Sequence, residues 1–108
     1  PTTDIANDLI EIALNSKNNG VSEIFVGGVP IRADTSLEKR RFQLNETLMG
    51  LCNFHGFTFI DHSKITTNDL LDGVHLNRDG ARILADDYLD ALRTTFNGIQ
   101  DVRTGYAR

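Results

Sequence analysis

The sequence has few of the residues and patterns that mark a protein class most directly. Its single cysteine, Cys52, excludes an intrachain disulfide and a thiolate metal site. Cys52 follows Leu51 in an apolar helical pattern, which favours a buried small side chain over a nucleophile. No apolar run approaches the ~18 residues of a membrane span and no signal peptide is recognised, so the sequence predicts no compartment.

Excess positive charge is also absent. The formal net charge is -4, so no global basic field would draw the chain to nucleic acid or to a membrane surface. The local exception is Lys39-Arg40-Arg41, a pattern typical of a solvated helix face, with phosphate binding as the less favoured alternative. A length of 108 residues with 40% apolar content suits one globular domain. No cofactor is expected, and nucleic acid is not expected as a partner.

Apolar residues at helical spacing alternate with two short apolar runs. Three helices are predicted: Thr3 to about Asn18, a Thr35–Glu38 capping box to about Asn53, and an Asn77 cap to Phe96. Two strands are predicted at Glu23–Val29 and Phe57–Ile60. Each strand has consecutive apolar residues, which is typical of a strand that is covered on both faces of a parallel sheet.

This order of elements predicts an α/β fold with three αβα layers around a short parallel sheet. Two short strands cannot shield three apolar helix stripes and their own edges. We therefore expect a partner chain to complete the sheet, either a second copy or an N-terminal fragment. Residues 1–97 are assigned to this partial domain, and residues 98–108 to a flexible tail.

Asp72 precedes His75 by three residues, directly before the last predicted helix. This spacing lets the carboxylate accept the Nδ1 proton, which fixes the tautomer and leaves Nε2 as an outward-facing base. Gly73 allows the chain to turn between the two residues. An aspartate and a histidine bonded in this way are two of the three members of a hydrolytic triad. Taken alone, the segment fits an exposed loop with a capping aspartate equally well.

The segment Asp72-Gly73-Val74-His75-Leu76-Asn77-Arg78-Asp79-Gly80-Ala81 closely resembles the last block of the SGNH, or GDSL-type, hydrolases. The resemblance to the second half of such a domain covers about residues 3–97. It implies a flavodoxin-like fold and the hydrolysis of an ester substrate, with Asp72 orienting His75 as general base. The loop Val29–Arg32 and the strand end Phe59–Asp61 resemble, less specifically, the esterase-like domains of certain retrotransposon-encoded proteins.

The chain departs from this family in lacking its first block, Gly-Asp-Ser, which carries the nucleophile. The glycine block and the Gly-x-Asn-Asp block of the oxyanion hole are also missing. Asn7-Asp8 is not a substitute, because it falls inside a predicted helix and has no leading glycine after a strand. Ser63 is a weak candidate for a replacement nucleophile, since Asp61-His62-Ser63 better fits a solvated turn at a strand end.

A metal site built from His55, His62 and His75 is disfavoured, because no pair of these histidines has helical i,i+4 spacing. Two functions are therefore predicted. The first is the C-terminal segment of an SGNH-type ester hydrolase, inactive alone because it lacks the nucleophile and the oxyanion donors. The second is a non-catalytic assembly or binding module that dimerises through its sheet edge. Oligomeric state discriminates between them, because only the second requires a dimer.

Overall fold

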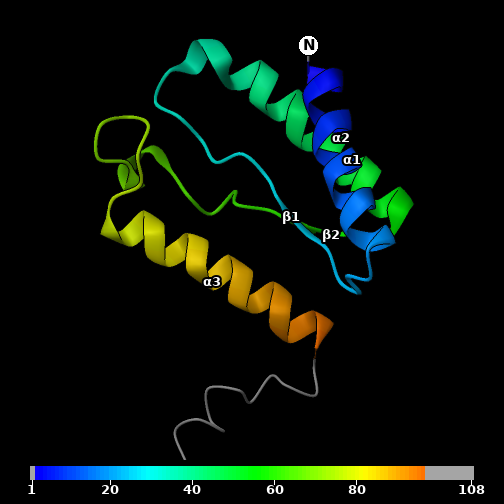
Figure 1. Cartoon of the computed structure of the whole chain (residues 1–108). Helices are drawn as coiled ribbons and strands as arrows, with labels where there is room; N and C mark the ends of the chain where they lie inside the picture. Colours follow the sequence, from blue (N-terminus) through cyan, green and yellow to red (C-terminus); the bar gives the residue numbers. More distant parts are fainter. Residues whose placement is uncertain (1, 97–108) are drawn as a thin grey trace, which may run out of the picture.

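The computed structural model describes residues 2–96 (Figure 1). The chain runs through α1 (Thr2–Asn18), β1 (Phe25–Gly27), the 3-10 turn η1 (Thr35–Leu37), α2 (Glu38–His55), β2 (Thr58–Ile60), the 3-10 turn η2 (Thr67–Asp69) and α3 (Arg78–Thr95). The two strands pair in parallel, with Val26 opposite Phe59. This mixed structure agrees with the predicted α/β class. The predicted tail, residues 98–108, lies outside the described residues.

The main core lies where α1 and α2 pack on each other and on the strands. Ile10 and Ala13 of α1 meet Cys52 of α2 and Phe57, and all four side chains are buried. Val26 packs against this cluster, whereas the neighbouring Phe25 ring lies 6.4 Å from that of Phe96 at the end of α3. Successive residues of β1 therefore meet different helices, because side chains alternate between the faces of a strand.

The helices lie on different sides of the strands in Figure 1, where α1 and α2 run side by side and α3 lies apart from them. Each strand has one hydrogen-bonded neighbour among residues 2–96, so the sheet has two strands. Three complete layers and a partner chain that closes the sheet remain predictions. Within the described residues, no helix is long and apolar enough to cross a membrane.

β1 is shorter than the predicted strand Glu23–Val29 because a side chain replaces the sheet partner at its end. The Asn45 amide of α2 bonds both backbone groups of Val29, with Val29 N donating to Oδ1 at 2.8 Å and Nδ2 donating to Val29 O at 3.0 Å. Buried Gly28 permits this approach, since a Cβ there would lie 3.2 Å from Asn45 Oδ1 and 2.8 Å from Phe59 Cζ.

The predicted capping box Thr35–Glu38 is wrong. Asp34 caps η1 instead, and its Oδ1 accepts hydrogen bonds from Ser36 N at 3.0 Å and from Ser36 Oγ at 2.7 Å. Glu38 pairs with Arg41 one turn later, so its carboxylate does not reach back to the helix start. The end of α2 is as predicted, because Gly56 adopts the left-handed conformation with φ 77°.

Candidate active site

The Asp72–His75 pair forms the hydrogen bond that the sequence predicts. His75 Nδ1 lies 2.6 Å from Asp72 Oδ2. An ionised carboxylate can only accept, so Nδ1 carries the proton and Nε2 holds the free lone pair. The side chains of His75 and Asp72 are 75% and 55% exposed. The pair therefore presents a basic nitrogen on an open surface.

Backbone donors hold Asp72 in place from within its own loop. Its Oδ1 accepts from Val74 N at 3.0 Å and from His75 N at 2.8 Å. These three hydrogen bonds, the backbone N–H of His75 first and then its side chain and Val74 N, hold the pKa of Asp72 far below its usual range. Asp72 is therefore ionised at neutral pH and accepts the hydrogen bond from His75.

Two contacts close the loop that carries the pair. Leu71 N donates to His75 O at 2.7 Å, and Leu70 bridges Leu76 in antiparallel fashion. Gly73 makes the turn with φ 86°, a conformation that costs a residue with a Cβ about 1 kcal/mol or more. The loop is thus a short hairpin with Asp72 and His75 on opposite sides of its turn.

The segment after His75 enters α3 through a close contact. The Asn77 side chain accepts from Gly80 N at 2.9 Å and donates to Asn68 O at 3.0 Å, so it caps α3 and holds the η2 turn. A Cβ on Gly80 would lie 2.5 Å from Asp69 O. Only glycine lets the helix approach η2 this closely, which fixes the start of α3 next to His75.

A second histidine–aspartate pair, missed by sequence reasoning, lies in the interior. His62 follows β2, and its Nδ1 is 2.8 Å from Asp87 Oδ2 of α3. The side chains of His62 and Asp87 are only 2% and 4% exposed. The Tyr88 ring covers His62 at 5.4 Å between centroids, and Lys64 Nζ lies 3.9 Å from Asp87 Oδ1. This pair connects β2 to the middle of α3.

His62 and Asp87 are 25 residues apart, so no local sequence pattern predicts that they meet. Asp87 lies three residues after Leu84, within the helix face that meets the strands rather than on the opposite face. The interpretation of Asp61-His62-Ser63 as a solvated turn is wrong for His62, which is buried, and right for the exposed Asp61 and Ser63. Asp61 Oδ1 accepts from Ser63 N at 2.8 Å, as in a tight polar turn.

Ser63 and the third histidine do not join the Asp72–His75 pair. Among the hydrogen bonds of residues 2–96, none connects Ser63 with His75 or with His62. His55 lies at the end of α2, where its ring stacks on Phe57 at 5.7 Å. Across the same residues, no three His, Cys, Asp or Glu side chains are placed to hold a metal ion. Burial raises the pKa of the Cys52 thiol, which makes it a poor nucleophile.

Comparisons with family models, curated proteins and solved structures find no match for this chain.

Proposed function

We propose that this chain supplies the base and its orienting carboxylate to an SGNH-type ester hydrolase whose nucleophile lies on a segment outside these 108 residues. The observation that carries the proposal is the 2.6 Å bond between Asp72 Oδ2 and His75 Nδ1 on an open surface. A bond of this length fixes the imidazole and keeps Nε2 free for a serine hydroxyl.

In this reaction His75 acts first as a base and then as an acid. Nε2 takes the proton of the incoming serine as its Oγ attacks the ester carbonyl, and it then protonates the departing alcohol. In the second half, Nε2 takes a proton from water as the water oxygen attacks the acyl carbon. The bond from this carbon to serine Oγ then breaks, and Nε2 returns the proton to Oγ as the carboxylic acid leaves. Asp72 stabilises the imidazolium that forms between these steps, and its low pKa keeps it charged throughout.

The isolated chain is expected to be inactive. The resemblance assigns the serine and the oxyanion donors to blocks that this sequence lacks, and those groups account for most of the acceleration in acyl transfer. The unpaired edges of the two-stranded sheet give the remaining part of such a domain a place to add strands. The proposed enzyme is thus one αβα domain, of which this chain is the C-terminal part.

Hydrolysis of a short-chain aryl ester tests this proposal. The 108-residue chain should show no turnover above background, and a longer polypeptide that includes the preceding coding sequence should be active. His75→Ala should abolish that activity. His62→Gln should lower stability but leave the turnover per folded molecule unchanged. Turnover by the short chain that disappears in Ser63→Ala would contradict the proposal, because the nucleophile would then be present here.

A second function, self-assembly through the sheet edge, is favoured by one separate observation. α1 exposes three apolar side chains at helical spacing, Ile5, Leu9 and Ile12, of which Ile12 is 63% exposed. An exposed apolar stripe of this kind is typical of an interface. Light scattering over a tenfold range of concentration tests it: a stable dimer that Ile12→Asp dissociates supports assembly, and a compact monomer excludes it.

A further inference from the structure

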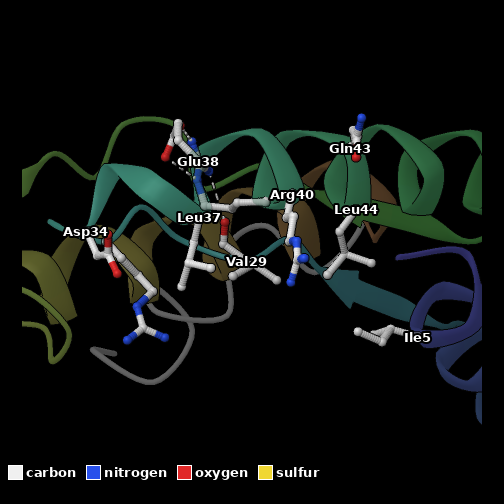
Figure 2. A pocket seen from close by; sticks show the side chains of 10 residues that line it. Ile5, Val29, Asp34, Leu37, Glu38, Arg40, Gln43 and Leu44 are labelled. Atoms are coloured by element: carbon white, nitrogen blue, oxygen red, sulfur yellow. Dashed lines mark hydrogen bonds and ion pairs between the residues drawn. The ribbon is translucent and has the colours of Figure 1, made fainter. Parts of the chain in front are cut away.

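A cavity of about 740 Å³ lies between the loop after β1, the first half of α2 and the start of α1 (Figure 2). Its apolar walls come from Ile5, Val29, Leu37 and Leu44. Leu37, the last residue of η1, and Leu44 of α2 both line the cavity and are half-buried. A volume of this size with mostly apolar walls is typical of a small-molecule site.

The cavity lining has three arginines, Arg32, Arg40 and Arg41, against two carboxylates, Asp34 and Glu38. Figure 2 shows the Arg40 guanidinium between the side chains of Leu37 and Leu44. No hydrogen bond or ion pair engages Arg40 within residues 2–96. Arg32 lines the same cavity. Arg40 is exposed to solvent at the rim of the cavity, where its guanidinium can meet the anionic group of a ligand whose apolar body lies on Leu37 and Leu44.

The acidic residues in the lining are already engaged. Glu38 pairs with Arg41, and this bond lowers the pKa of Glu38. Asp34 bonds both the hydroxyl and the backbone N–H of Ser36, which lower the pKa of Asp34. Both carboxylates are therefore ionised and turned to partners in their own turns. Arg41 is engaged by Glu38 and Arg32 lies near Asp34, so Arg40 is the cation of the lining with no carboxylate partner among residues 2–96.

The cavity adjoins the Asp72–His75 loop. Arg32 and Asp34 both line it, and Ala33 between them donates its backbone N–H to Gly73 O at 2.9 Å. Gly73 is the turn residue between Asp72 and His75. Asn45 holds Val29, at the start of the segment 29–34, by two hydrogen bonds. This segment therefore forms one wall of the cavity and also contacts the turn between Asp72 and His75.

We propose that this cavity binds a medium-chain acyl carboxylate, with the chain between Leu37, Leu44 and Ile5 and the carboxylate on Arg40. The mostly apolar lining suits an acyl chain, and the exposed guanidinium of Arg40 suits its anionic end. The link to hydrolysis rests on the proposed function, in which such a carboxylate is the product of the His75 reaction. Binding itself requires no serine, so it is testable in this chain alone.

Titration of the 108-residue chain with sodium dodecanoate below its micelle concentration, followed by NMR, tests the proposal. Saturable shifts are expected at Val29, Leu37 and Leu44. Arg40→Gln should weaken binding about fivefold, the value of one partly exposed charge pair near 1 kcal/mol. Lys39→Gln is the matched control, because Lys39 is the adjacent cation and does not line the cavity. It should leave affinity unchanged.

Dodecyltrimethylammonium supplies the second control, with the same chain and the opposite charge. It should bind more weakly than dodecanoate, and the preference should disappear in Arg40→Gln. Equal binding of the two amphiphiles, equal effects of both variants, or shifts at the exposed Ile12 instead of the cavity would overturn the proposal. Such a result would leave the ester hydrolysis test unaffected, and an inactive extended polypeptide would leave dodecanoate binding intact.

Discussion

The molecule contains two histidine–aspartate pairs that share one bond, from Nδ1 to a carboxylate oxygen, in opposite surroundings. Asp72 and His75 are three residues apart and open to solvent, whereas His62 and Asp87 are 25 residues apart and almost completely buried. The exposed pair leaves Nε2 available for a proton transfer. The buried pair lies between the end of β2 and α3, where its hydrogen bond is expected to stabilise the folded chain. The same hydrogen bond is thus open to a reactant in the exposed pair and closed to solvent in the buried pair.

The largest expected effect is on the buried pair. Asp87→Ala leaves His62 without its partner in the interior and should lower the free energy of unfolding by about 3 kcal/mol, as for other broken buried pairs. Asp72→Ala, made at the exposed pair, should change it much less. Urea denaturation followed by circular dichroism measures both. If the two variants lost equal stability, the distinction between the pairs would fail.

A paired glycine experiment sharpens the same comparison. Gly27→Ala puts a Cβ 2.5 Å from Tyr88 Oη and 3.2 Å from His62 Nε2. The Tyr88 and His62 side chains must therefore shift, at a cost of about 2 kcal/mol. Gly73→Ala forces φ 86° on a residue with a Cβ and puts that Cβ 2.9 Å from Ala33 Cβ, so it should cost about 1–2 kcal/mol.

Gly50→Ala is the control for both glycine variants, because a Cβ at this position in α2 meets no atom within 4 Å. It should stabilise the chain by up to about 1 kcal/mol through helix propensity. Thermal unfolding ranks the three variants. The comparison fails if Gly27→Ala is as stable as Gly50→Ala, since Tyr88 and His62 would then accommodate the added Cβ without cost.

The smallest effect concerns the ionisation of Asp72. Its folded pKa is depressed, so its contribution to stability is present above the unfolded value of about 4 and is lost only as the pH falls through the lower folded value. Carboxyl ¹³C shifts should therefore show Asp72 still ionised at about pH 3. His75→Ala should raise the midpoint only in part, because the two backbone donors remain. A midpoint near 4 in the unmodified chain would contradict the hydrogen-bonded geometry.

The contrast also explains what could be predicted from sequence. The Asp72–His75 bond is local, since spacing, Gly73 and the Asn77 cap lie within six residues, and it was predicted. The helices were predicted because their periodicity is also local. His62 and Asp87 meet only after α3 has packed on β2, so no local pattern reveals them. The end of β1 was missed for the same reason, because Asn45 reaches Val29 from 16 residues away.

Arg40 illustrates a partial prediction. The interpretation of Lys39-Arg40-Arg41 as a solvated helix face is confirmed for Lys39 and Arg40, which are exposed, whereas Arg41 is half-buried. Arg41 turns to Glu38 and to Val29 O at 3.2 Å, Arg40 lines the cavity, and Lys39 does not line it. Adjacent cations on a helix point about 100° apart, so charge clustering alone does not tell which of them lines a site.

The most direct measurement of the central claim is the effect of Asp72→Asn on the turnover of an aryl ester and on the urea midpoint, in the polypeptide extended upstream. The account predicts that kcat falls on the order of a thousandfold, because the imidazole loses its fixed tautomer, while the urea midpoint stays nearly unchanged. A fall of activity and stability together, or unchanged turnover, would contradict the assignment of Asp72 and His75 as the catalytic pair.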